Sequence, residues 1–457
     1  MPRVRRRTRA APAGWIPDAV WPTRRSPWVT VYLAVCVVLA ALNLRTLFSS
    51  AAAILPELTD ALGLTAGQVT LLSWIPVLLV GLLSPLGAWL LPRLGTWPTL
   101  LAALVLVSLG LGLRGLDVAG LGLAPLWAGT VLCGAGVAVG NVTLPVVVKM
   151  DFPQRMGLMS GVYTMVICLS AALAAAMTVP VYEATAHEWH RTLGFWAYVA
   201  AVALLLVGPA LWAVRGRVGR VPSRWVVRPP RRDEVSESDG GPERAVVEAP
   251  APAEPTPSPW TSRTAWHLTA LMACQAVSSF AVFAWMAPIL RDRGLDASTA
   301  GVLVFVCIAA QMLGSLIVPV LAARRPSQSG LTVVCGLLTG LGFVLVIVGP
   351  LGLAAAWALM LGLGQGGLTA VALTMIGLRS ADAAMAGRVS AMMQFLGYAL
   401  GSFGTLAVGQ LYAVTGSYAP SAVLFGASGL AAAGFGWLAG RDRIVHVRGG
   451  GPGPASW

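Results

Sequence analysis

One arginine stands inside an apolar segment near the beginning of the chain. The segment VVLAALNLRTLFSSAAAIL, from Val37 to Leu55, is apolar except for small polar residues and Arg45. A charged side chain at the centre of a hydrocarbon layer costs about 3 kcal/mol on insertion scales. Such a guanidinium must be held by carbonyls, amides, hydroxyls or water, or by an anion that binds and leaves.

No carboxylate is placed to neutralise Arg45 permanently. Asp and Glu occur outside the long apolar stretches, in loops, tails and a central polar segment. On a helix, Ala41, Phe48 and Ser49 would surround Arg45 with small side chains and one ring, so this face could border a cavity. We therefore expect Arg45 to bind substrate. The structural alternative is an arginine that packs between helices and bonds to main-chain carbonyls at a kink.

Further polar and aromatic side chains at membrane depth are candidate substrate contacts. They are Asn141, Tyr163, Gln275, Trp285, Gln365 and Gln394. Amide groups offer donors and acceptors for a small planar polar ligand. The alternative for each amide is a hydrogen bond between helices, and for each aromatic ring it is packing.

Composition identifies the environment of these residues. Of 457 residues, 57% are hydrophobic and 11% are charged, against about 25% charged in a typical soluble protein, and the mean hydropathy is +0.76. This composition indicates an all-α integral membrane protein. The net charge of +13 does not indicate nucleic-acid binding, because the basic residues are interspersed with apolar runs. The six cysteines lie in apolar segments and are interpreted as packing residues.

Twelve stretches are long and apolar enough to span a membrane as helices. Their approximate limits are 29–54, 66–91, 97–114, 121–147, 157–181, 193–214, 265–290, 298–322, 330–349, 352–378, 388–413 and 418–440. The first stretch is too long for a cleavable signal peptide, so we expect it to remain as the first span.

The basic residues predict the orientation. With the N-terminus inside, all but five of the 31 basic residues fall on the cytoplasmic side. The five exceptions are Arg45, Arg114, Arg191, Arg291 and Arg293. Both chain ends are therefore predicted to be cytoplasmic. Arginine predominates over the single lysine, Lys149, as in GC-rich bacterial genomes, so we place the chain in a bacterial inner membrane.

A polar segment divides the twelve stretches six plus six. It is rich in Pro, Ser and mixed charge and is predicted to be a disordered tether. The predicted organisation is a basic cytoplasmic tail (1–28), a six-helix half (29–214), a cytoplasmic linker (215–263), a second six-helix half (264–440) and a cytoplasmic tail (441–457).

The two halves resemble each other in sequence. At an offset of 230 residues, GNVTLPVVVK aligns with GGLTAVALTMIGLR, which places Lys149 opposite Arg379. Arg45 has Ala276 or Val277 at the equivalent position, so its charge is not part of the shared scaffold. Two six-helix halves in parallel repeat are the plan of the major facilitator superfamily, in which substrate binds near the midplane between rocking halves.

Four segments carry a closer resemblance. NLRTLFSSAAAILPEL, GNVTLPVVVKMDFPQRMGLMSGVYTM, APILRDRGLDASTAGVL and LGLGQGGLTAVALTMIGLR resemble the cyanate and 2-nitroimidazole transporter family within that superfamily. The likeness runs from about residue 30 to residue 440 apart from the linker, and GNVTLPVVVKMDFP is its most specific piece.

The superfamily's loop motif is degraded in this chain. In AWLLPRLG, Pro92 stands where the usual pattern has an aspartate, while Arg93 and Gly95 remain. We expect Arg93, Gly95, Lys149 and Arg379 to act at the cytoplasmic gate. How that gate is latched stays open at this point.

The resemblance implies a secondary transporter for a small anion, weak acid or compact polar heterocycle. We expect a monomer in the lipid bilayer that carries a small-molecule substrate with or without protons, and we expect no cofactor, metal ion, nucleic-acid partner or enzyme activity. Import and export are both compatible with the sequence. The alternative is a membrane receptor or sensor that keeps the fold without transporting.

Overall fold

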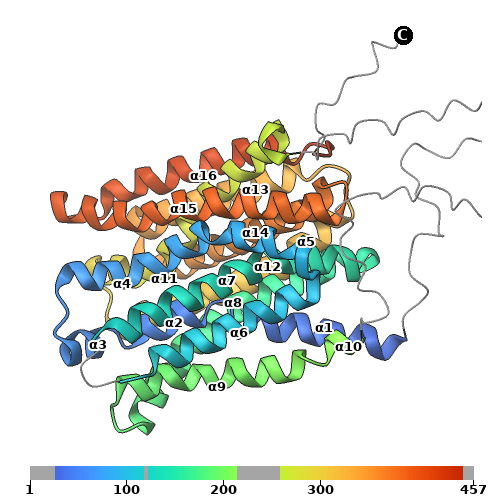
Figure 1. The fold of residues 1–457 in the computed structure, drawn as a ribbon. Coiled ribbons are helices and arrows are strands. Elements are labelled where there is room, and N and C mark those ends of the chain that lie inside the picture. The colour runs from blue at the N-terminus through green and yellow to red at the C-terminus, as the bar shows by residue number, and fades with distance from the viewer. Residues whose placement is uncertain (1–25, 118–121, 214–257, 446–457) are drawn as a thin grey trace, which may run out of the picture.

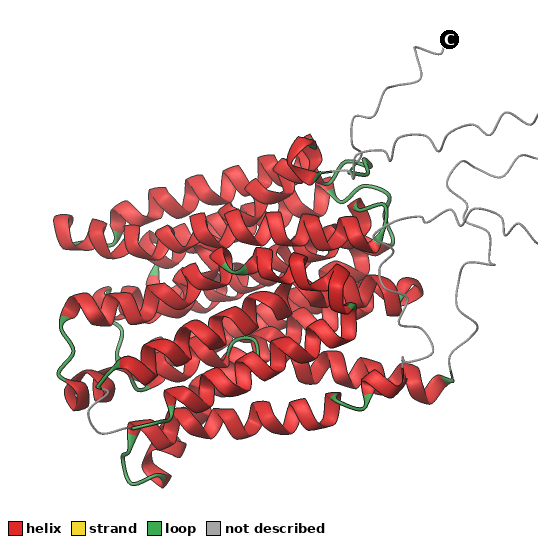
Figure 2. Cartoon of the chain, viewed as in Figure 1, coloured by secondary structure: helices red, strands yellow, loops and turns green. Residues whose placement is uncertain are grey.

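The computed structural model describes residues 26–117, 122–213 and 258–445, and these residues form helices joined by loops (Figure 2). The first half contains α1 (Pro27–Ala41), α2 (Thr46–Ala53), α3 (Leu55–Leu62), α4 (Ala66–Leu82), α5 (Ser84–Leu94), α6 (Thr96–Arg114), α7 (Ala124–Asp151), α8 (Met156–Ala184), α9 (Trp189–Val207) and α10 (Ala210–Ala213). The second half contains α11 (Arg263–Asp292), α12 (Ala297–Ala323), α13 (Ser329–Val348), α14 (Ala354–Arg379), α15 (Ala383–Thr415) and α16 (Ala419–Ala439).

The described helices account for the predicted spans. Eleven are long and apolar enough to cross a membrane, counting α1 with α2 as one span, and the bent pair α4 and α5 provides a twelfth. The prediction of an all-α membrane protein with twelve spans in two six-helix halves is confirmed. The predicted limits in the tails and linker fall largely on residues 1–25, 214–257 and 446–457, which lie outside the described residues.

The two halves lie side by side with their long helices roughly aligned (Figure 1). They meet mainly through α4, α5 and α7 against α15, and through α8 against α12 and α14. The start of α1, the end of α10, the start of α11 and the end of α16 lie at one end of the bundle, which we call the linker end (Figure 1). α3 and the start of α9 lie at the opposite end.

The first span is not the single helix that the sequence predicts. α1 ends at Ala41, and residues 42–45 form a turn before α2 begins. Asn43 donates its amide side chain to the Leu39 carbonyl at 2.9 Å, and a side-chain bond of this kind competes with the helical ladder. Arg45 therefore lies at a helix break, where its carbonyl accepts the N–H groups of Phe48 and Ser49 at 3.2 Å.

The second span bends by 40° for a simpler reason. Pro85 has no N–H to donate to the carbonyl four residues earlier, so α4 gives way to α5 at Leu83. Among the described residues, side chains cap the starts of four helices, α4, α11, α12 and α15. For example, Asp296 accepts a hydrogen bond from the Thr299 N–H at 3.0 Å, and the hydrogen bonds from Thr299 hold the pKa of this carboxyl below its usual range.

Glycine permits a close contact between two helices of the second half. α13 and α16 cross where Gly340 faces Gly429, and a Cβ atom on Gly429 would lie 2.4 Å from the Cα of Gly340. Rotating a side chain cannot relieve such a contact, because the two helix backbones fix the positions of both the Cβ and the Cα atom. Small residues at helix crossings are the usual solution in membranes.

We predict that Gly429→Ala lowers the melting temperature of the detergent-solubilised protein, because overpacking a tight contact costs about 1–3 kcal/mol. Intrinsic tryptophan fluorescence during heating measures this change. Gly434→Ala on the same helix is the matched control, since a Cβ there meets no atom within 4 Å. An equal loss of stability in both variants would contradict this account of the crossing.

Candidate functional site

A narrow cavity lies between the two halves, and Arg45 lines it. The first half contributes Arg45, Asn141, Thr164, Ile167, Cys168 and Ala171, and the second contributes Ser279, Phe283, Gln311, Gly366, Thr369, Leu373 and Tyr398. The cavity volume is about 20 Å³. This volume holds about one water molecule, whereas ligand pockets usually measure several hundred cubic ångströms. A molecule larger than water therefore fits only if the halves separate.

Arg45 reaches the cavity with its charge unpaired. The guanidinium carbon lies 5.1 Å from the centroid of the Phe280 ring and 5.7 Å from that of Phe48. Within the described residues its side chain makes no hydrogen bond or ion pair, and no carboxylate lines the cavity. The packing alternative for Arg45 required a kink and hydrogen bonds from its guanidinium to main-chain carbonyls. The kink is present, but the guanidinium donates to no main-chain carbonyl among the described residues. Two aromatic faces hold the guanidinium instead.

The helix break sets the position of Arg45. Because the residue precedes the first turn of α2, its side chain leaves the backbone in the middle of the bundle, beside the positive end of the α2 dipole. α2 is itself held by Arg114, whose Nη1 donates to the Leu47 carbonyl at 3.1 Å. Arg114 is 1% exposed. Its position could have been suspected from sequence, since it is one of the five basic residues that orientation does not explain.

Of the predicted amide contacts, Asn141 lines the cavity and the three glutamines lie behind it. Gln394 donates to the main-chain carbonyl of Asn141 at 3.0 Å and to Ser390 Oγ at 2.8 Å, which ties α15 to α7 across the halves. Gln275 Oε1 accepts from Thr369 Oγ1 at 2.8 Å and from Gln365 Nε2 at 3.4 Å. These glutamines therefore follow the helix-bonding alternative in this conformation.

The buried glutamines nevertheless retain unused acceptors. The Oε1 atoms of Gln365 and Gln394 are buried and have no hydrogen-bond partner among the described residues. An unpaired buried acceptor costs about 1–3 kcal/mol. A rearrangement of the halves that brings a donor to these atoms would recover that free energy.

The two predicted aromatic contacts do not line the cavity. Tyr163 is 1% exposed and buried one residue before the lining residue Thr164. Trp285 donates its indole N–H to the Thr405 carbonyl at 3.1 Å and packs near Tyr418. Trp285 therefore belongs to the second half's core.

The lining includes residues that the sequence analysis did not select. Tyr398 lines the cavity, and its ring centroid lies 5.8 Å from that of Phe280, which in turn faces Arg45. Gln311, Cys168 and Thr369 add polar atoms. The criterion that selected Tyr163, an aromatic hydroxyl within an apolar span, applies equally to Tyr398 and would have found it.

One of the four predicted gate residues bridges the halves. Lys149, near the end of α7, donates its ammonium to the Gly377 carbonyl at 2.9 Å and also to the Ser380 carbonyl. Gly377 lies in the last turn of α14 and Ser380 directly follows the helix, so the ammonium lies at the end where the helix dipole favours a cation. The contact joins the two halves at the linker end.

The other three gate candidates act within their own half. Arg379 forms an ion pair with Asp442 at 2.9 Å and donates to the Gly440 carbonyl at 2.8 Å. Arg93 is exposed and lies 3.8 Å from the centroid of the Trp89 ring on its own helix. Gly95 has φ +88° at the start of α6, a backbone conformation that glycine adopts readily.

The described residues offer no metal centre. No group of three or more His, Cys, Asp or Glu side chains in ranges 26–117, 122–213 and 258–445 could hold a metal ion. The arrangement instead provides one fixed positive charge, aromatic faces and hydroxyl or amide groups around a compressible cavity. Such a set of groups can bind a small anion or a compact polar ring.

We predict that Lys149→Met loosens the linker end, because it removes a charged donor whose hydrogen bonds are worth about 1.5–3 kcal/mol. Spin labels on the exposed residues Gln154 and Ala381, one in each half, should show a longer-distance population in the variant. Arg155→Met removes an exposed positive charge nearby and should leave the distance distribution unchanged. Identical distributions in all three proteins would rule out this role of Lys149.

Comparisons with known proteins agree with this geometry. The family model described as Major Facilitator Superfamily matches residues 33–405. The chain is 31% identical to the uncharacterized transporter YycB of Bacillus subtilis, over 91% of this chain and 94% of that protein. It is 29% identical to the 2-nitroimidazole transporter of Escherichia coli, over 91% and 97%. It is 27% identical to the Escherichia coli cyanate transport protein CynX, over 84% and 90%.

Solved structures show the same fold at low identity. The proton:xylose symporter XylE superposes with a TM-score of 0.69 at 12% identity, covering 92% of this chain and 98% of that one. The human organic anion transporter MFSD10 superposes with a TM-score of 0.62 at 13% identity, covering 90% and 100%.

Proposed function

We propose, since the chain belongs to the Major Facilitator Superfamily of membrane transporters, that it moves a small anion, weak acid or compact polar heterocycle across the membrane. The observation that carries this substrate class is the guanidinium of Arg45, which lies on the cavity between the halves without a partner among the described residues. A fixed positive charge repels cations and attracts anionic or electron-rich polar groups.

The names of two relatives support the same class. One is a 2-nitroimidazole transporter and one a cyanate transport protein, and both align over most of this chain. Cyanate is a small anion and a nitroimidazole is a flat polar ring. A guanidinium flanked by aromatic faces suits both, because it offers a planar pair of donors beside surfaces that accept a ring.

The mechanism we infer is alternating access around this cavity. On the linker side, Lys149 joins the halves. On the other side, Trp74 donates to Ser402 Oγ at 3.1 Å, one helical turn beyond the lining residue Tyr398. Substrate enters when one of these contacts opens, displaces the packing around Arg45, and leaves when the other opens.

The orientation follows from the distribution of basic residues. We place the linker end, and with it both chain termini, in the cytoplasm, because Arg and Lys concentrate there. The proposed setting is a bacterial inner membrane, with the protein working as a monomer. The relatives compared above are all named as transporters, so nothing favours a receptor or sensor.

We predict that Arg45→Ala lowers uptake of cyanate or 2-nitroimidazole into proteoliposomes about 10- to 100-fold, the equivalent of one or two lost charge-assisted hydrogen bonds. Arg45→Lys should recover little, because an ammonium cannot make a planar two-pronged contact. Thermal-shift titration with each substrate, run in parallel, should lose its signal in both variants.

Arg324→Ala is the matched control for this experiment. Arg324 is exposed at the end of α12 and does not line the cavity between the halves, so uptake should stay near the wild-type rate. Wild-type flux in the Arg45→Ala protein would overturn the assigned role of Arg45. A full panel of small anions and heterocycles without any thermal shift in the wild type would overturn the substrate class.

We further predict that Phe280→Leu weakens apparent substrate affinity about 2- to 30-fold, the range of about 0.5–2 kcal/mol for a cation over a ring. The loss follows because the ring at 5.1 Å holds the guanidinium towards the cavity. Phe343→Leu is the control, since that ring stacks on Phe425 in the second half's core. Phe343→Leu should lower the melting temperature without changing affinity, and a matching affinity loss there would refute the specific role of Phe280.

A further inference from the structure

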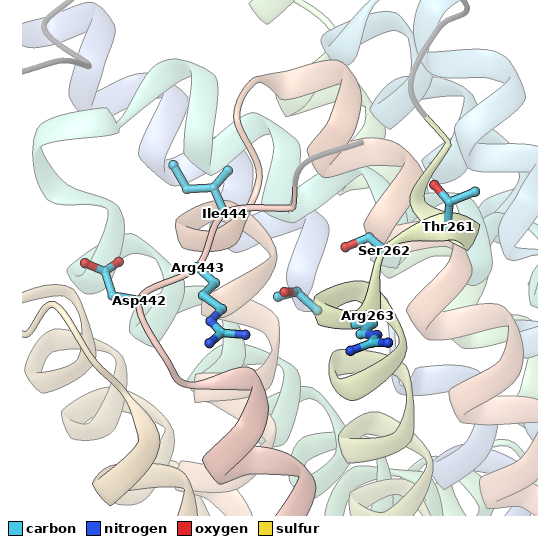
Figure 3. Close-up of a pocket in the computed structure, with 7 residues that line it drawn as sticks. Thr261, Ser262, Arg263, Asp442, Arg443 and Ile444 are labelled. Carbon is cyan, nitrogen blue, oxygen red and sulfur yellow. The ribbon is translucent and has the colours of Figure 1, made fainter. Parts of the chain in front are cut away.

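A second cavity lies at the linker end, away from Arg45 (Figure 3). Its volume is about 600 Å³. One wall is the start of α11 with Arg263, and the other is the segment after α16 with Arg443. Figure 3 shows both arginine side chains extending in the same direction, towards the side on which α11 and α16 continue.

The two arginines of this cavity are not neutralised by the described residues. Asp442 is the acid in its lining, and its carboxylate is paired with Arg379 at 2.9 Å. Figure 3 shows Asp442 directed away from Arg263 and Arg443. Neither of these arginines forms an ion pair within the described part of the chain. The cavity therefore carries two uncompensated positive charges on two separate segments.

Hydroxyl groups supplement the guanidinium groups. Ser262 and Thr264 line the same wall as Arg263, and the Ser262 hydroxyl faces the cavity between the two arginines (Figure 3). Guanidinium forks and hydroxyl donors together match the tetrahedral oxygens of a phosphate group. A carboxylate would use fewer of these donors.

Exposed tryptophans place the cavity at the depth of lipid headgroups. Trp260, Trp266 and Trp437 are 48%, 45% and 50% exposed, and they lie on the elements that form the two walls. Arg441 lies 4.2 Å from the centroid of the Trp437 ring. Tryptophan and arginine at the end of a membrane helix are typical of the interface between hydrocarbon and water.

We propose that this cavity binds a phosphate group, with Arg263 and Arg443 as its paired contacts, and that an anionic phospholipid headgroup supplies it. The bound phosphate joins the start of α11 to the segment after α16. That segment is also fixed to the end of α14, since the Val445 N–H donates to the Arg379 carbonyl at 2.7 Å. The ligand thus stabilises the linker end beside the carbonyls that accept Lys149.

The test uses the full-length protein in detergent micelles and measures its melting temperature. Phosphatidylglycerol, phosphatidylcholine and inorganic phosphate are added separately, with chloride matching the ionic strength of the phosphate arm. We expect phosphatidylglycerol to raise the melting temperature several degrees above phosphatidylcholine. Arg263→Gln with Arg443→Gln should remove at least half of that difference.

A matched pair of substitutions separates a specific site from general surface charge. Arg324→Gln with Arg325→Gln removes the same charge from exposed positions at the end of α12, outside the cavity, and should keep the full lipid effect. Arg443→Gln alone, on a non-helical segment, covers the case in which the double variant folds poorly. Native mass spectrometry of the same proteins counts the phosphatidylglycerol molecules retained.

The outcomes distinguish the source of the phosphate. Stabilisation by inorganic phosphate alone, lost in the cavity variant and kept in the matched pair, would support the site and identify free phosphate as its ligand. An equal lipid effect in the cavity variant and the matched pair would overturn the proposal. It would also fail if phosphatidylglycerol had no advantage over phosphatidylcholine and phosphate none over chloride.

Discussion

The main constraint on this structure is that guanidinium groups inside an apolar bundle need hydrogen-bond acceptors. Arg114 donates to the Leu47 carbonyl, and Arg293, a partly buried residue at the end of α11, donates to the Val346 carbonyl at 2.8 Å. At both places a main-chain oxygen accepts a hydrogen bond from a guanidinium group. The guanidinium of Arg45, which lies on the cavity, instead contacts the rings of Phe48 and Phe280. Since an unsatisfied charge is costly, this exception is the basis of the proposal that the partner of Arg45 comes from outside the chain.

The break in the first span makes this exception possible. In a continuous helix, the direction of the Arg45 side chain would be set by the helix face on which it lies, and the Arg45 backbone would be fixed by the helical hydrogen bonds. The turn at residues 42–45 instead makes α2 a separate short helix. Arg114 donates to the Leu47 carbonyl of this helix, and Arg45 directly precedes its first turn. A short helix between two breaks can shift with small changes in backbone angles, which suits the proposed role of Arg45 as a substrate contact between moving halves.

Run length and composition were sufficient to predict the spans, because a membrane helix needs about 20 apolar residues whatever its neighbours are. The break before Arg45 was not predictable in this way, since residues 37–55 contain no Pro or Gly. Arg45 and Asn141, which were selected by residue type as substrate contacts, both line the cavity. Residue type alone could not distinguish these cavity-lining residues from Gln275 and Gln394, which bond to neighbouring helices. Tertiary packing decides which helix each side chain faces.

The internal repeat also shows that equivalent positions in the sequence need not have equivalent hydrogen-bond partners. Lys149 and Arg379 are equivalent in sequence, yet Lys149 bonds across the halves while Arg379 bonds to Asp442 in its own half. The contact across the halves uses neutral carbonyls as acceptors. Breaking a buried ion pair costs about 3–5 kcal/mol, whereas a hydrogen bond from an ammonium is worth about 1.5–3 kcal/mol, and less where water can replace the carbonyls. A half-buried lysine bonded to carbonyls at a helix end is therefore easier to separate than an ion pair, which suits the proposed role of Lys149 as a reversible contact between the halves.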